Sequence, residues 1–119
     1  MTYYHTTLAT DFDLAATDDI CLTDDIDASE MYVADGGRIL SVSVPDLRIA
    51  DQDELKAAGR ALGMEGYYAF ELADSAKVRA ALGADGFDAV EYDDMTPDNA
   101  IEHTTLRVFG AACQSLTIA

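Results

Sequence analysis

Three polar residues stand out because they fall on predicted strands or a predicted helix and not in the acidic loops of the chain. They are His5 on the first predicted strand, Tyr32 on a short predicted helix, and Glu102 at the start of a late strand. A histidine can hold a ligand by hydrogen bonding, an aromatic ring can stack on a planar group, and a carboxylate can stabilise a developing positive charge. Each also has a plain structural explanation, since strand ends and helix faces often carry such side chains.

Common catalytic and metal-binding motifs are missing from the chain. The sequence contains no glycine-rich phosphate loop, no G-x-S-x-G, no H-E-x-x-H and no C-x-x-C. Cys21 and Cys113 are far apart and lack the close pairing of a structural zinc site. We therefore predict no metal site and interpret both cysteines as small buried residues in a reducing compartment.

The elements that must position these residues form an α+β order, with strands first, helices in the middle and strands last. Strands are predicted for residues 2–7, 20–23, 39–44, 89–92, 103–109 and 115–118. Helices are predicted for a segment capped by Asp27 and Glu30 that ends at Gly36-Gly37, for residues 54–62 capped by Asp53, and for residues 75–82 capped by Asp74 or Ser75. Residues 67–72 fit either a strand or an amphipathic helix.

The chain is strongly acidic, with 23 Asp and Glu against 7 Lys and Arg among 119 residues and a net charge of −16. Half of the residues are hydrophobic, which predicts a single folded domain over residues 1–119. The charge excludes electrostatic binding of nucleic acids and of anionic membranes. It fits solubility or a high-salt habitat, and it also fits a negative face that meets a basic partner. No leader or membrane-spanning stretch is evident, so we expect a cytoplasmic monomer.

Four short motifs, taken in chain order, resemble the ADP-ribosyltransferase superfamily. The matching segments are Tyr4-His5-Thr6-Thr7, Leu22-Thr23-Asp24 followed by Ala28-x-x-x-Tyr32, Gly86-Phe87-Asp88-Ala89-Val90, and Glu102-His103-Thr104. Together they extend from residue 3 to about residue 109. In length and in the spacing from the histidine to the tyrosine helix, the chain is most similar to the small phage-encoded anti-CRISPR members.

The resemblance implies split antiparallel β-sheets with short flanking helices and NAD as co-substrate. It assigns Glu102 as the catalytic residue beside an oxocarbenium-like state. The NAD-binding roles it implies are His5 on the adenosine ribose, the Thr6 backbone on the nicotinamide amide, Thr23 on the ribose, and Tyr32 stacked on nicotinamide. The implied activity is mono-ADP-ribosylation of a host protein, with a CRISPR–Cas subunit as a candidate target.

The chain departs from the family pattern at three points. Thr6 replaces a common glycine, the second aromatic expected near residues 42–44 is missing, and Ala100 stands where an acidic or amide residue often activates the acceptor. The few basic residues outside the middle helices that could meet a pyrophosphate are Arg38, Arg48 and Arg107. The alternative is therefore a non-catalytic acidic inhibitor that mimics DNA and binds a basic protein surface.

Overall fold

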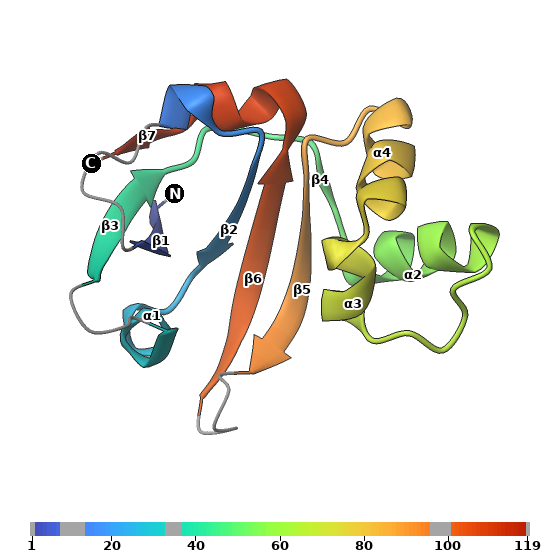
Figure 1. The fold of residues 1–119 in the computed structure, drawn as a ribbon, viewed down its shortest axis with the longest axis horizontal. Coiled ribbons are helices and arrows are strands. Elements are labelled where there is room, and N and C mark those ends of the chain that lie inside the picture. The colour runs from blue at the N-terminus through green and yellow to red at the C-terminus, as the bar shows by residue number, and fades with distance from the viewer. Residues whose placement is uncertain (1, 8–13, 33–36, 96–100, 119) are drawn as a thin grey trace.

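Seven strands form one mixed sheet in the computed structural model, which describes residues 2–7, 14–32, 37–95 and 101–118 (Figure 1). The sheet order is β4-β5-β6-β2-β1-β3-β7. The strands are β1 (Thr2–Thr7), β2 (Asp19–Thr23), β3 (Arg38–Ser43), β4 (Ile49–Ala50), β5 (Ala89–Met95), β6 (Glu102–Phe109) and β7 (Thr117–Ile118). The helices are α1 (Ile26–Tyr32), α2 (Gln52–Ala61), α3 (Ala69–Asp74) and α4 (Ala76–Ala84), with short 3-10 helices η1 (Leu14–Ala16) and η2 (Gly110–Ser115). The α+β prediction is confirmed.

The strands of the sheet pair over most of their length except at the junction between β1 and β2. β6 pairs antiparallel with β5 and with β2 along most of its length, whereas β4 and β5 pair in parallel. β1 and β2 share one register pair, Tyr4 with Thr23. The strands on either side of this junction belong to one mixed sheet that is narrowly joined at β1–β2, whereas the family resemblance implied split antiparallel sheets.

Each side of the sheet carries its own hydrophobic core. One core contains Leu22, Val42, Leu106 and Val108, and it is closed by Leu14 of η1 and Cys113 of η2. The other contains Val90 and Tyr92 of β5, packed against buried residues of the three middle helices, Leu55, Leu72, Ala73, Val78 and Leu82. Figure 1 shows α2, α3 and α4 gathered beside β4 and β5, while α1 lies near β1 and β2.

Two helix caps differ from the predicted ones. Asp25, rather than Asp27, accepts hydrogen bonds from the first amides of α1, at 2.8 Å from the Asp27 nitrogen and 3.3 Å from the Ala28 nitrogen. Asp51, rather than Asp53, caps α2 through a capping box with Glu54. In both cases the helix begins two residues earlier in the chain than predicted, because an aspartate is available there to accept the free amides.

The structure also decides what residues 67–72 form and whether the two cysteines are buried. Residues 67–72 do not form a strand, because α3 begins at Ala69 and buries Ala69, Leu72 and Ala73 with helical spacing. Cys113 is buried as predicted, but Cys21 is exposed. Of the predicted helix stop at Gly36-Gly37, Gly36 lies outside the described residues and Gly37 directly precedes β3. Among the helices described, none is long and apolar enough to cross a bilayer.

Candidate functional site

An open hollow of about 1100 Å³ lies where α1 and α3 begin, at the ends of β5 and β6. Tyr4 of β1 and Ile26 of α1 contribute to one side, and Tyr68, just before α3, lines it as well. The remaining lining residues are Asp24, Asp25, Asp93, Asp94, Glu102, His103 and Thr104. The hollow is therefore built from segments that are up to 100 residues apart in the chain, brought together by the order of the strands.

Five of the ten lining residues are acidic, and none of those described is lysine or arginine. Two of the carboxylates hold backbone in place: Asp24 accepts from the Thr104 amide at 3.0 Å, and Asp25 caps α1. Within the described part of the chain, the carboxylates of Asp93 and Glu102 form no hydrogen bond or ion pair. Asp93 and Glu102 are therefore the lining acids best able to bind a cation, since a ligand would not have to displace an internal partner.

The inner side of the hollow contains a buried polar cluster around His103. The Nδ1 atom of His103 lies 3.0 Å from Oγ1 of Thr23 and 3.5 Å from Oγ1 of Thr105. The Thr105 hydroxyl also donates to Asp94 at 3.4 Å. His103, Thr23 and Thr105 are all buried. Since buried polar groups are costly unless they are hydrogen bonded, this cluster holds β2, β6 and β5 in register beneath the hollow.

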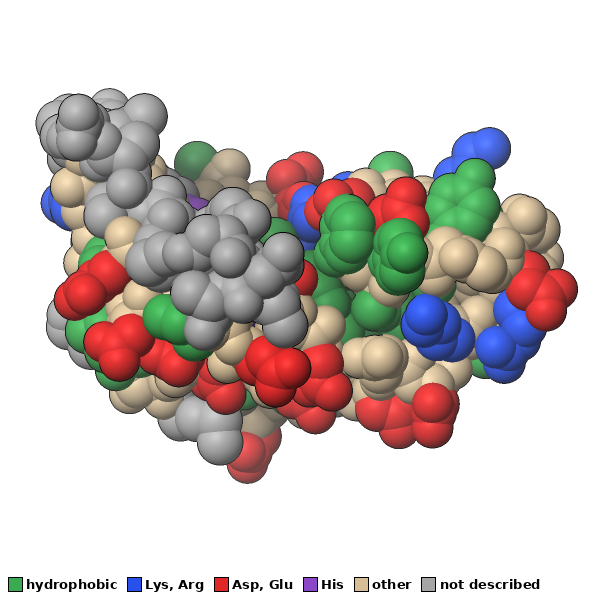
Figure 2. All heavy atoms as spheres, turned by 90° about the horizontal axis from the view of Figure 1, so that it is seen from below, with side chains coloured by type: hydrophobic (Ala, Val, Ile, Leu, Met, Phe, Trp, Pro, Cys, Tyr) green, Lys and Arg blue, Asp and Glu red, His purple; other side chains and the backbone are tan. Residues whose placement is uncertain are grey.

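Two stacked aromatic rings lie at the α3 side of the hollow. The Tyr68 and Phe70 ring centroids are 5.9 Å apart and the ring planes differ by 7°. Both rings are exposed, Tyr68 to 69% and Phe70 to 47%. In Figure 2, green hydrophobic side chains gather right of the grey atoms with red acidic side chains above and below them, and most of the blue basic side chains lie farther right, on the side of the middle helices.

The structure brings two of the five predicted site residues near the hollow. Glu102 lines it, and Thr23 lies beneath it through the hydrogen bond to His103. His5 and Thr6 are not among the lining residues, and His5 Nδ1 instead donates to the Cys21 carbonyl at 3.0 Å. Tyr32 is the last residue of α1, and its side chain lies outside the described part of the structure.

The sheet register explains why His5 and Glu102 are not neighbours. Tyr4, Thr23 and Thr105 lie side by side on β1, β2 and β6. His5 lies one residue beyond this row on β1, and Glu102 lies three residues from it on β6 in the opposite direction. Their backbones are separated by four residue steps and two strand spacings, or roughly 16 Å. A ligand would have to extend across the β1–β2 junction in order to contact both side chains.

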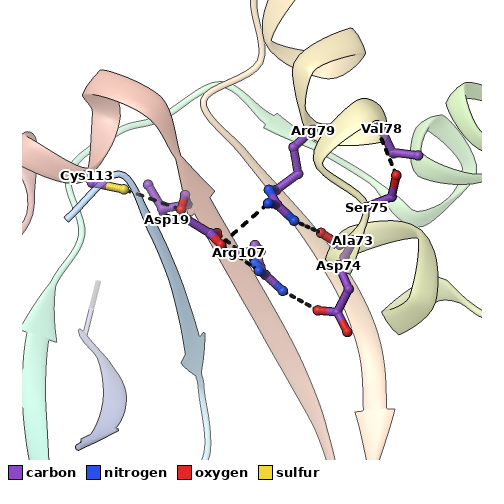
Figure 3. Close-up of polar contacts among 9 residues, drawn as sticks. Asp19, Ala73, Asp74, Ser75, Val78, Arg79, Arg107 and Cys113 are labelled. Carbon is purple, nitrogen blue, oxygen red and sulfur yellow. Dashed lines mark hydrogen bonds and ion pairs between the residues drawn. The ribbon is translucent and has the colours of Figure 1, made fainter.

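None of the three arginines proposed for a pyrophosphate lines the hollow. Arg107 binds Asp19 and Asp74, as the close-up shows (Figure 3). The Arg48 guanidinium lies 4.6 Å from the centroid of the Phe87 ring. Arg38 begins β3, opposite Thr7 of β1, and does not line the hollow. No lysine or arginine in the described lining therefore offsets the five carboxylates.

Several residues of this site were missed from the sequence, although the chain offers indications of them. Asp93 and Asp94 directly follow the predicted strand 89–92, and Tyr67-Tyr68 is an adjacent pair of aromatics before a helix. His103 directly follows Glu102, the residue that the sequence had already singled out. What the sequence lacks is any indication that these segments meet.

Comparison with known proteins does not assign the chain to a family. Among the described residues, no group of three or more histidine, cysteine or acidic side chains is arranged to hold a metal ion. No protein-family model matches the chain, and no significant match is found to a curated protein or to a solved structure.

Proposed function

We propose that this chain is a non-catalytic acidic binding protein whose hollow engages a basic surface on a protein partner. The observation that carries the proposal is the set of five carboxylates around the hollow, with no lysine or arginine among the described lining residues. A surface of this sign attracts cationic groups and repels nucleic acids, nucleotides and other anions. A protein that itself binds nucleic acid, such as a CRISPR–Cas subunit, would present a suitable basic surface.

The electrostatics of the free protein support the same proposal. Carboxylates gathered at one site repel one another, and the net charge of −16 adds to that repulsion. A basic partner would relieve it, and long-range attraction would speed the encounter. The buried His103 cluster fixes the strands that carry Asp94 and Glu102, so the acidic groups need little rearrangement on binding.

A titration with acetylated, amidated hexa-lysine tests whether the hollow is the cationic site. We expect Asp93→Asn/Glu102→Gln to weaken binding by about fivefold, since each exposed charge contact contributes up to about 1 kcal/mol. The matched control is Asp46→Asn/Glu65→Gln, which removes the same charge from two exposed residues outside the hollow. Calorimetry from about 50 to about 300 mM NaCl should show affinity falling steeply with salt. Equal losses in the two double variants would show that the attraction is spread over the surface, and the proposed site would be rejected.

The second candidate is the NAD-dependent mono-ADP-ribosyltransferase that the motifs suggest. The observation in its favour is that Glu102 lines a hollow next to Thr23 and His103, where a carboxylate could face a ribose. The five carboxylates weigh against it, because NAD carries a pyrophosphate.

Two measurements separate the transferase from the binding protein. The transferase requires that NAD raise the melting temperature and that Glu102→Gln abolish transfer of ADP-ribose or hydrolysis of NAD. The binding protein requires that Glu102→Gln alone only weaken hexa-lysine binding, because four other carboxylates remain. If NAD produces no thermal shift and labelled NAD yields no product with any cell extract, catalysis should be abandoned.

A further inference from the structure

The stacked pair formed by Tyr68 and Phe70 is unusual because both large rings are exposed at the edge of an acidic hollow. Tyr68 lines the hollow, while Phe70 supports it from α3. The Phe70 ring lies nearly parallel to the Tyr68 ring at a centroid distance of 5.9 Å, and 69% of Tyr68 remains exposed. Exposed aromatic groups beside a polar cavity are typical of binding surfaces.

Local structure fixes the backbone that carries the Tyr68 ring before any partner binds. The Tyr68 backbone amide donates to Oε1 of Glu71 at 3.0 Å, which fixes the start of α3. Ala69, Leu72 and Ala73 are buried in the core beneath, so the helix that carries Phe70 is anchored as well. Because the backbone at Tyr68 is already ordered, binding there costs side-chain entropy but little backbone entropy.

The Tyr68 ring and the nearby carboxylates can bind a guanidinium group together, the ring through its flat face and the carboxylates through its N–H groups. The face of a tyrosine ring attracts a positive charge, and a planar guanidinium can stack on it while its N–H groups bind carboxylates in pairs. A lysine ammonium is a compact, strongly hydrated charge that gains less from such a flat surface. Asp93 and Glu102 line the same hollow as Tyr68 and have no internal partner within the described chain.

We infer that the partner presents an arginine, which stacks on the open face of Tyr68 and binds the carboxylates of the hollow. This inference rests on the proposed function and adds the identity of the recognised side chain. Tyr68 is then the residue that sets the preference for arginine over lysine, and the carboxylates supply attraction to any cation.

The test compares acetylated, amidated hexa-arginine with hexa-lysine of equal charge, by calorimetry with the full chain. Wild type should bind hexa-arginine roughly fivefold more tightly, in keeping with a cation–π contact at a partly exposed site. Tyr68→Leu should bring the two affinities to within about twofold by lowering that of hexa-arginine alone. The control is Tyr67→Leu, which changes an exposed tyrosine that does not line the hollow and should keep the preference.

Equal affinity of wild type for the two peptides would overturn the inference. So would a preference that survives Tyr68→Leu, or a Tyr68→Leu variant that weakens both peptides equally. None of these outcomes touches the proposed function. That function fails if Asp93→Asn/Glu102→Gln binds hexa-lysine no worse than its charge-matched control, or if NAD stabilises the protein and is consumed by it. Thermal unfolding of each variant verifies folding, and little change is expected because Tyr68 is exposed.

Discussion

Arg107 holds both carboxylate oxygens of Asp19, with Nε 2.7 Å from Oδ1 and Nη2 2.6 Å from Oδ2. Its third nitrogen, Nη1, donates to Asp74, the last residue of α3. Arg79 of α4 lies 3.7 Å from the same Asp19 carboxylate. Because Asp19 begins β2 and Arg107 lies on β6, this network joins the sheet to two of the helices that pack on it (Figure 3).

Replacing Asp19 with asparagine should lower the free energy of unfolding by about 2 kcal/mol at about pH 7, a value between those of exposed and buried ion pairs. The reason is that Arg107, which is largely buried, would lose its bidentate partner. Chemical denaturation measures the change. The control is Asp18→Asn, which removes a neighbouring exposed carboxylate and should change stability by less than about 0.5 kcal/mol. Similar losses in both variants would mean that the ion pair contributes little.

The contribution of Asp19 should also depend on pH in a defined direction. Burial alone would raise the pKa of Asp19, but the hydrogen bonds from Arg107 and the charges of Arg107 and Arg79 outweigh it, so the pKa is lowered. A carboxyl whose pKa is lower in the folded state adds stability above its unfolded pKa of about 4, and that stability disappears as the pH falls through the folded pKa. The difference between wild type and Asp19→Asn should therefore be full at about pH 7 and shrink below about pH 4. A difference that grows on acidification would contradict the assigned shift.

Thr23→Val tests the buried cluster under the hollow. Valine keeps the shape of threonine but removes the oxygen that binds His103 Nδ1 and accepts from the Asp25 amide. We expect a loss of about 1–2 kcal/mol, the usual result of removing a hydrogen-bond partner from a buried polar group. Thr117→Val, at an exposed position of β7, should have little effect. Equal denaturation midpoints for Thr23→Val and wild type would mean that the cluster does not stabilise the fold.

The start of α2 can be tested with two nearby aspartates. Asp51→Ala should destabilise the protein by about 1 kcal/mol, because it removes the acceptor for the Glu54 amide. Asp53→Ala should cost only a few tenths of a kcal/mol, since this residue contributes charge near the helix start but does not cap it. Thermal melts of the two variants decide between them, and a larger effect at Asp53 would support the cap predicted from the sequence.

Two helical glycines should respond to alanine in opposite directions. A Cβ at Gly59 of α2 would lie 2.6 Å from Cδ2 of the buried Leu72, so Gly59→Ala should be destabilising by about 1–2 kcal/mol despite the better helix propensity of alanine. A Cβ at Gly83 of α4 would lie 3.8 Å from a Phe109 ring carbon, an ordinary contact distance. Gly83→Ala should therefore raise the free energy of unfolding by up to about 1 kcal/mol. Unfolding in urea measures both. Stabilisation by Gly59→Ala would show that Leu72 can move aside.

Most of the individual strands could be predicted from local sequence, because alternating or continuous apolar residues indicate which faces are buried. β1 has the bounds that were predicted for it, and β3 is displaced by one residue. The two-residue strand β4 was missed, since Ile49–Ala50 is too short to show a period and forms a strand only by pairing with β5. α3 was ambiguous because the helical spacing of its buried residues becomes visible only against the core.

The candidate site could be predicted only in part. The sequence alone determined an acidic chain of α+β order, in which Glu102 stood apart as a carboxylate at the start of a strand. Tertiary structure decided which of the 23 acidic residues act together, because pairing of β5 and β6 places Asp94 opposite His103 and brings Glu102 into the same hollow. It also placed His5 away from that hollow, through a register that extends across β1, β2 and β6. Strand order and register arise from contacts between residues far apart in the chain, and for that reason no local pattern could have shown where the acidic residues and Tyr68 meet.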